Sequence, residues 1–244
     1  MARTIIVGDV HGCMAELRAL LDKVKYEPSD SLVLVGDLVA RGPDSRAVVA
    51  FARKSGALVV RGNHEDKLLR WYAAKRAHAR GKRDRPRTLA ELHEEVATSL
   101  RKSDWAFLAA TPLWIDLREH GLRVVHAGVL PGVPINKQEK RTLLSIRSLG
   151  PDGEARERGG RILWGMRYEG PPHIVFGHNA KESPQLHPWA TGLDTSCVYG
   201  GRLTALVLDR GERVPVDLRK RRRRLVSVPA RRAYFDGAKG RPAR

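Results

Sequence analysis

Three short apolar runs in the first third of the chain alternate with helical patterns, and this alternation constrains the fold most strongly. Residues 4–7 precede a segment whose apolar residues recur at helical spacing, and helical segments also follow residues 32–35 and 58–60. Repeated strand-loop-helix units are typical of α/β proteins with at least partly parallel strands. We therefore predict an α/β fold.

Further apolar runs predict strands over residues 113–117, 122–126, 173–176 and 203–208. The first two of these runs flank His120-Gly121, which predicts a hairpin. Residues 75–87 are rich in basic side chains and include Gly81 and Pro86, so we expect an exposed connection there. We expect residues 150–160, which are polar and rich in glycine, to form a loop within the same domain.

Positive charge is concentrated at the C-terminal end. Residues 219–244 contain eleven arginines and lysines and one acid, Asp236, so they carry ten of the eighteen net positive charges. A run of like charges without apolar periodicity usually forms a solvated, disordered arm. We therefore predict a globular domain over residues 1–218 and a basic, disordered tail over residues 219–244. A contact between this tail and nucleic acid, polyphosphate or another polyanion is the alternative.

The remaining composition is that of a soluble protein. No stretch approaches the roughly 20 apolar residues that cross a bilayer, and the N-terminal residues lead directly into a predicted strand instead of a signal peptide. We expect a cytoplasmic monomer without membrane contact. Cys13 and Cys197 lack the number and spacing of a disulfide framework or a zinc-thiolate site, so we expect reduced thiols.

Five polar motifs each follow an apolar run, where a strand is expected to end. In chain order they are Gly8-Asp9-Val10-His11-Gly12, Gly36-Asp37, Gly62-Asn63-His64-Glu65, Val125-His126-Ala127-Gly128 and Phe176-Gly177-His178-Asn179. A single glycine-polar pair is a common turn signal. Because ligand sites in α/β proteins gather at the carboxyl ends of strands, the five motifs together indicate one shared site.

The chemistry of these side chains favours metal binding. Asp9 and His11 lie two residues apart on a predicted loop and can face one ion, while Asp37 can bridge two. A set of carboxylate, imidazole and amide oxygen ligands suits manganese, iron or zinc better than calcium or a closed structural zinc site. Two cations about 3.5–4 Å apart clamp a phosphoryl group and activate a bridging water. The residues therefore predict a two-metal phosphoesterase.

These motifs resemble those of the calcineurin-like metallophosphoesterases, within the phosphoprotein-phosphatase branch. Loops of that branch read Gly-Asp-x-His-Gly, Gly-Asp-x-x-x-Arg-Gly and Gly-Asn-His-Glu, and the resemblance covers about residues 4–210. It implies a catalytic domain folded as a two-sheet β-sandwich, with helices on both outer faces. It also implies hydrolysis of phosphoric esters or anhydrides by a metal-bridged hydroxide.

The resemblance implies a role for each site residue. It places Asp9, His11 and Asp37 on the first metal, and Asp37, Asn63, His126 and His178 on the second. His64 is implied as the general acid that protonates the leaving oxygen, and Arg41 and Arg147 as the arginines that clamp the phosphate. Mn²⁺ is the expected metal, with Co²⁺, Zn²⁺ and iron as alternatives. We expect Asp194 to support the sheet edge or a histidine ligand, without binding metal itself.

Ala40 departs from the pattern of the eukaryotic-type Ser/Thr phosphatases, in which an aspartate at this position orients the catalytic histidine. The surrounding string, residues 36–43, instead resembles bacterial symmetrical bis(5′-nucleosyl)-tetraphosphatases, which split diadenosine tetraphosphate into two ADP. ADP is a better leaving group than a serine alkoxide, so the acid needs less support. We therefore expect symmetrical cleavage of dinucleoside polyphosphates.

Three other functions remain open from the sequence. The same site suits a phosphoprotein Ser/Thr or Tyr phosphatase, and the basic surface suits a polyphosphatase. A nucleic-acid-binding protein with an inactive site is the least favoured, because the ligands are intact. Five histidines lack paired ligand spacing and are expected to be satisfied or solvent-facing: His78, His93, His120, His173 and His187.

Overall fold

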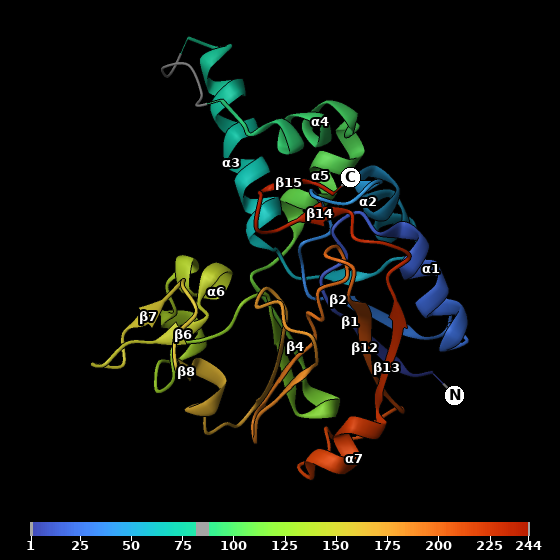
Figure 1. The fold of residues 1–244 in the computed structure, drawn as a ribbon, viewed down its shortest axis with the longest axis vertical. Coiled ribbons are helices and arrows are strands. Elements are labelled where there is room, and N and C mark those ends of the chain that lie inside the picture. Colours follow the sequence, from blue (N-terminus) through green and yellow to red (C-terminus); the bar gives the residue numbers. More distant parts are fainter. Residues whose placement is uncertain (1, 82–87, 244) are drawn as a thin grey trace.

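The computed structural model describes residues 2–81 and 88–243, and its body consists of two five-stranded sheets (Figure 1). The first sheet has the order β13 (Leu225–Pro229), β12 (Arg202–Leu208), β1 (Thr4–Val7), β2 (Ser31–Leu34), β3 (Leu58–Val59). The second has the order β10 (Gln185–Leu186), β11 (Ala190–Gly192), β9 (His173–Phe176), β5 (Leu122–Val125), β4 (Trp114–Leu117). Strands β4 and β5 pair antiparallel, which confirms the predicted hairpin.

The apolar side chains of each strand divide between the two faces of its sheet, because successive side chains point in opposite directions. Ile6 and Val33 of the first sheet belong to one apolar cluster with Val124 and Val175 of the second, so this cluster joins the sheets. The intervening residues of the first sheet pack against α1 (Met14–Lys23) and α2 (Ser45–Lys54). The outer face of the second sheet packs against α6 (Lys140–Ser145) and Trp164. The predicted sandwich with helices on both outer faces is thus confirmed.

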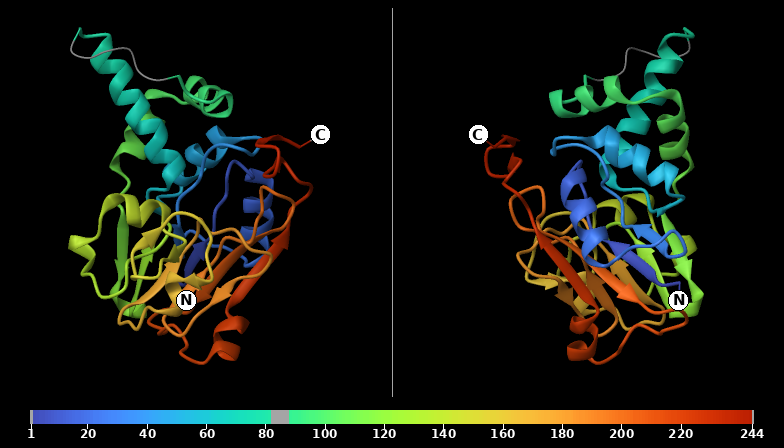
Figure 2. Two further views of the ribbon diagram at one scale, coloured as in Figure 1. Left: turned by 60° about the vertical axis from the view of Figure 1, so that its left-hand side comes forward. Right: turned by 90° about the vertical axis from the view of Figure 1, so that its right-hand side faces the viewer.

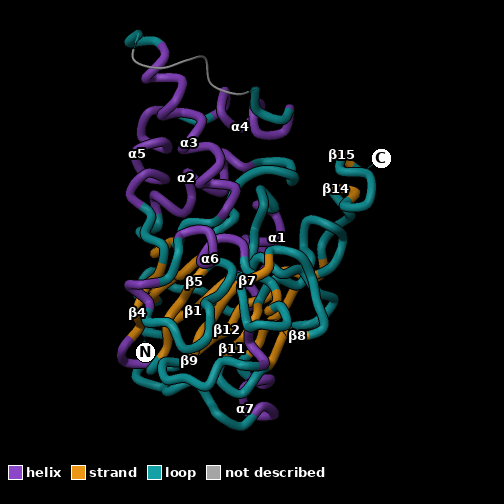
Figure 3. Tube along the Cα trace, turned by 90° about the vertical axis from the view of Figure 1, so that its left-hand side faces the viewer, coloured by secondary structure: helices purple, strands orange, loops and turns teal. Residues whose placement is uncertain are grey.

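Parallel pairing brings the carboxyl ends of several strands to one end of the sandwich. Strands β1, β2 and β3 are parallel neighbours in the first sheet, as are β5, β9 and β11 in the second. Helices α2, α3 (Asn63–His78), α4 (Glu91–Ser99) and α5 (Lys102–Ala110) gather beyond this end (Figure 3). The loops that follow the parallel strands therefore lie together at this end of the sandwich, next to these helices.

Helices α3 and α4 project beyond the sandwich (Figure 2). Helix α3 continues through residues 75–78, so the exposed connection predicted to begin at residue 75 starts later. The predicted connection also included four basic residues that lie outside the described part of the chain: Lys82, Arg83, Arg85 and Arg87. Among the residues that the structure describes, no helix is long and apolar enough to span a bilayer.

The predicted loop over residues 150–160 contains a strand. A small sheet has the order β7 (Ala155–Arg156), β6 (Ser148–Leu149), β8 (Ile162–Leu163). Both residues of β7 are exposed, so the strand carries no apolar alternation by which the sequence would reveal it. The described residues also include three short 3₁₀ turns: Arg118–His120 between β4 and β5, Ile135–Lys137 before α6, and Trp164–Met166 after β8.

The prediction of a disordered tail from residue 219 is wrong for the described residues. Residues Leu218–Arg223 form helix α7, and β13 pairs antiparallel with β12 at the edge of the first sheet. The Arg221 side chain is fully buried and donates hydrogen bonds to the carbonyls of Pro215, His187 and Pro188. Backbone carbonyls therefore compensate the buried charge of Arg221, one residue of the basic run. A final hairpin pairs β14 (Phe235–Asp236) with β15 (Arg241–Pro242).

Candidate metal centre

The six predicted metal ligands lie just beyond the carboxyl ends of five strands, which belong to both sheets. Asp9 and His11 follow β1, Asp37 follows β2, Asn63 follows β3, His126 follows β5, and His178 follows β9. Three of these residues have positive φ angles: His11 (45°), Asp37 (48°) and His178 (62°). Such left-handed conformations are costly for residues other than glycine and cluster at functional sites, where the surrounding structure holds them.

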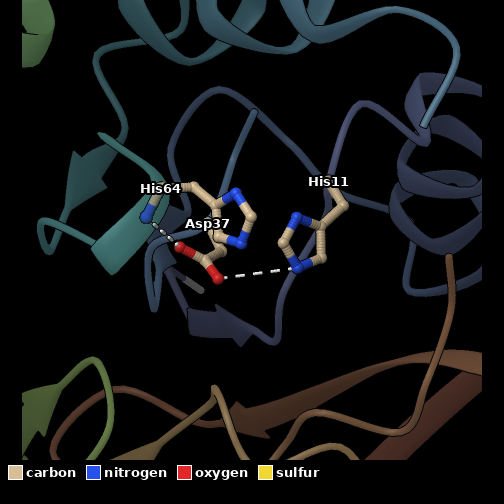
Figure 4. A group of neighbouring side chains, drawn as sticks. All are labelled: His11, Asp37 and His64. Carbon is tan, nitrogen blue, oxygen red and sulfur yellow. Dashed lines mark hydrogen bonds and ion pairs between the residues drawn. The ribbon is translucent and has the colours of Figure 1, made fainter. Parts of the chain in front are cut away.

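Asp37 lies at the centre of the cluster, between imidazoles from both sheets. Its Oδ2 atom is 3.5 Å from His11 Nε2, and its Oδ1 atom is 3.5 Å from His126 Nε2. The backbone N–H of His64 donates to Oδ1 at 3.0 Å. Figure 4 shows the carboxylate turned toward the His11 ring, with His64 beside it. This position fits a carboxylate that is shared by two cations.

The predicted second ligand set is brought together. Asn63 Oδ1 lies 2.9 Å from His126 Nε2 and 2.8 Å from His178 Nδ1. The nearest ligand atoms of Asp37, His126 and His178 all lie within 4.8 Å of one another. His126 donates from Nδ1 to the Val35 carbonyl at 3.0 Å, which leaves its Nε2 lone pair facing the cluster.

The predicted first set is brought together only in part. His11 donates from Nδ1 to the Val39 carbonyl at 3.0 Å, so the lone pair of its Nε2 atom faces the cluster, where it accepts from Arg41. The ligand atoms that lie within 4.8 Å of one another here belong to His11, Asp37 and His64. The buried Asp9 carboxylate instead accepts the backbone N–H of His178, at 2.9 and 3.1 Å.

The electrostatics of this cluster fit bound cations. Burial raises the pKa of Asp9 well above its usual range, and raises the pKa values of Asp37 and Asp194 to about 6. Burial also lowers the pKa of His11 well below its usual range and that of His126 to about 4. Carboxylates that resist ionisation beside neutral imidazoles form a donor set that divalent cations stabilise.

We expect the affinity for Mn²⁺ to fall as the pH is lowered through about 6. Asp37 must lose its proton to bind a cation, and its raised pKa keeps that proton in place below about 6; the raised pKa of Asp9 acts in the same direction. The imidazoles do not add to this effect, because the lowered pKa values of His11 and His126 keep both rings neutral. For each proton that the cation must displace, the Kd for Mn²⁺ should rise about tenfold for every unit by which the pH falls below the pKa. Calorimetric titrations between pH 5 and 7.5 measure this slope, and a constant Kd would contradict it.

Two predicted arginines face the same cluster. Arg41 donates to His11 Nε2 at 3.0 Å, and its guanidinium carbon lies 5.6 Å from the ring centre of Tyr199 and 5.8 Å from that of Phe235. Arg147 donates to Asn179 Oδ1 at 3.2 Å, and its charge lowers the pKa of Asp37. Arg41 therefore contacts a residue of the cluster directly, and Arg147 contacts Asn179, the neighbour of His178.

Glu65 has a structural role that the sequence analysis did not assign, although it belongs to the third motif. Its side chain is fully buried and accepts four backbone N–H groups. These donors belong to Asp37, Leu38, Val39 and Gly62, at distances between 2.8 and 3.2 Å. Glu65 thus ties the loop after β2 to the start of α3, and so fixes Asp37 relative to Asn63.

His93 is a second residue that the sequence analysis missed. Its Nε2 atom lies 3.0 Å from His64 Nδ1, and both rings are buried. The ring centres are 5.0 Å apart and the ring planes differ by 9°. No sequence motif predicts this contact, because His93 lies on α4, 29 residues away from His64.

The layered fold and the buried Asp, Asn and His cluster define the class of metal-dependent phosphoesterases. The chain belongs to the calcineurin-like phosphoesterase family, which residues 2–211 match. This family uses a binuclear centre of divalent metal ions. The chain is therefore a hydrolase of phosphoric esters or anhydrides.

Similar proteins carry tetraphosphatase names. The chain is 31% identical over 233 residues to a protein of Oceanobacillus iheyensis, with 88% of this chain and 92% of the relative covered. It is 33% identical to a protein of Halalkalibacterium halodurans, with coverage of 88% and 94%. Both relatives are named bis(5′-nucleosyl)-tetraphosphatase PrpE, asymmetrical. A crystal structure of a candidate diadenosine tetraphosphatase is 36% identical, covers 94% of each chain and superposes with a TM-score of 0.76.

Proposed function

We propose that this protein hydrolyses a phosphoanhydride bond of dinucleoside polyphosphates with the help of two divalent cations. The observation that carries the proposal is the position of Asp37 between His11 and His126, with Arg41 and Arg147 at the same cluster. Buried carboxylates suit the cations, and the guanidinium groups suit the anionic oxygens of a phosphate chain.

Each site residue has a place in the proposed reaction. Asp9, His11 and Asp37 would hold one cation, and Asp37, Asn63, His126 and His178 the other. Bound cations, with Mn²⁺ proposed and Co²⁺, Zn²⁺ or iron as alternatives, would activate water and neutralise phosphate charge. His64 donates a proton to the leaving oxygen, and the two arginines bind the non-bridging oxygens of the phosphate.

The bond that is cleaved distinguishes two versions of this proposal. The string around Ala40 predicts symmetrical cleavage, which gives two ADP from diadenosine tetraphosphate. The relatives from O. iheyensis and H. halodurans are named as asymmetrical enzymes, and their similarity extends over most of the chain. This similarity outweighs one short motif, so we propose asymmetrical cleavage to AMP and ATP.

A product analysis with Mn²⁺ and diadenosine tetraphosphate tests the proposal. AMP and ATP in equal amounts would support asymmetrical cleavage, whereas ADP alone would support the symmetrical prediction. Phosphopeptides and polyphosphate are tested in parallel, because a phosphoprotein phosphatase or polyphosphatase would release orthophosphate from them and leave the dinucleotide intact. Absence of metal-dependent hydrolysis in every assay would overturn the proposed function.

We further propose that the protein acts as a monomer and that α7 contacts polyanions. The exposed cations of this helix are Arg219, Lys220, Arg222 and Arg223. Helix α7 lies at the opposite end of the sandwich from helices α3 and α4 (Figure 1). A polyanion bound to α7 alone would therefore leave the candidate metal centre accessible. Binding of heparin that weakens steeply with salt, and is lost when these four residues become serine, is the expected result.

A further inference from the structure

We infer that His93 is a positioning residue for His64 and takes the place of the carboxylate that is missing at Ala40. This inference rests on the proposed function, in which His64 supplies a proton to the leaving group. Ala40 has no side chain that can accept a hydrogen bond. The nitrogen of His93 at 3.0 Å lies where His64 Nδ1 needs a partner.

The ring nitrogens of His64 have different tasks. The His64 ring meets the His11 ring edge to face, with centres 5.0 Å apart and planes at 83°, so it borders the cluster on one side and His93 on the other. A histidine that passes a proton from Nε2 keeps its proton on Nδ1 before and after the transfer. That Nδ1–H requires an acceptor throughout, and His93 Nε2 provides one.

The proton arrangement of His93 follows from the same contact. If Nε2 accepts a hydrogen bond from His64, the ring proton of neutral His93 must lie on Nδ1. Among residues 2–81 and 88–243, the His93 Nδ1 atom is buried without a hydrogen-bond partner. Within the described part of the chain, the side-chain hydrogen bonding of His93 is therefore directed at His64 alone.

The packing of α4 holds His93 in this position. Leu89, Val96 and Leu100 lie four residues before it, three after it and seven after it, and all three are buried in the main apolar core. Val96 lies one turn after His93 on the same face of α4, whereas Leu89 precedes the helix and Leu100 follows its last residue. The core therefore anchors α4 before, within and after the helix, which holds the backbone of His93 in place.

A neutral imidazole supports the His64 ring differently from a carboxylate. It fixes the orientation and the tautomer of the ring, but it gives less electrostatic stabilisation to a protonated ring than an anion does. Such an acid suffices for a leaving group of low basicity, such as a nucleotide phosphate, and serves an alkoxide poorly. The contact between His93 and His64 therefore favours anhydrides over serine phosphates.

Two substitutions test the role of His93 in catalysis. His93→Leu removes the acceptor and keeps the size of the side chain, and we expect it to lower kcat on diadenosine tetraphosphate by about 30-fold with little change in KM. His93→Gln places an amide oxygen near the position of Nε2 and should recover most of this loss. In a His64→Ala background, His93→Leu should have no further effect, because the two residues act together. Glu94→Leu, at the exposed neighbouring position on α4, should retain full activity.

A spectroscopic measurement tests the same contact without any turnover. In protein labelled with ¹⁵N-histidine, with the His64 signals assigned from their loss in His64→Ala, the shifts should show the proton on Nδ1. In His93→Leu they should show a mixture of tautomers. Unchanged His64 shifts in His93→Leu would overturn the inference, as would an equal loss of kcat with and without His64. Absence of activity in the wild-type protein would instead overturn the proposed function, and the NMR result would still decide the role of His93.

Discussion

The Asp37→Asn variant is expected to lose metal-dependent hydrolysis, with kcat falling by about 10³-fold or more. An asparagine can still accept the backbone N–H of His64, which Asp37 accepts at 3.0 Å. It removes the negative charge between His11 and His126 that the two proposed cations would share. The loss should therefore reflect weakened cation binding, with the backbone around residue 37 largely preserved.

Rates across a range of Mn²⁺ concentrations, together with a calorimetric Mn²⁺ titration, check this expectation. Asp116→Asn serves as a control, because Asp116 pairs with Arg123 on the hairpin of β4 and β5 and does not belong to the cluster. Asp37→Asn should bind fewer Mn²⁺ ions, whereas the control should match the wild type in stoichiometry and rate. A variant at residue 37 with normal activity would show that this carboxylate does not bridge catalytic metals.

The Glu65→Gln variant is expected to lose about 3 kcal/mol of unfolding free energy, although the side chain keeps its size. One carboxylate oxygen accepts from Leu38 and Val39, and the other accepts from Asp37 and Gly62. A glutamine has a single acceptor oxygen, so its NH₂ group faces two backbone donors whichever way the amide turns. These buried N–H groups then lose their partners.

Urea unfolding of the metal-free protein measures this effect separately from cation binding. Glu94→Gln, at an exposed position on α4, is the matched control and should change the unfolding free energy by less than about 0.5 kcal/mol. A similarly small change for Glu65→Gln would mean that the loop after β2 does not depend on the carboxylate. The predicted loss should also reduce activity, because the same loop carries Asp37.

Local apolar patterns were sufficient to predict seven of the ten strands of the two large sheets, and β10, β11 and β13 were missed. Residues 4–7 and 173–176 are buried along their whole length, and the strands found there have the predicted bounds. The hairpin of β4 and β5 turns at His120-Gly121 as predicted, with Gly121 at a φ of 63°. Patterns of this kind involve only a few consecutive residues, so they can be recognised in the sequence before the fold is known.

The elements that were missed depend on partners elsewhere in the chain. Strand β7 has no buried residue, and β13 follows directly after a run of arginines. The burial of Arg221 is possible because carbonyls of Pro188 and His187, more than thirty residues earlier, accept its N–H groups. Charge repulsion within the run favours exposure, whereas these long-range hydrogen bonds compensate the buried charge of Arg221.

The sequence by itself determined the chemical class of the site, since five polar motifs after apolar runs supply the carboxylates, imidazoles and amide of a two-metal hydrolase. Only the tertiary structure decided how these groups meet. It placed Asp9 against the backbone of His178, 169 residues away, and His93 against His64. It also packed Arg41 against Tyr199 and Phe235. The physical reason is that spacing along a chain fixes which side chains share a loop, whereas contacts between loops depend on how sheets and helices pack.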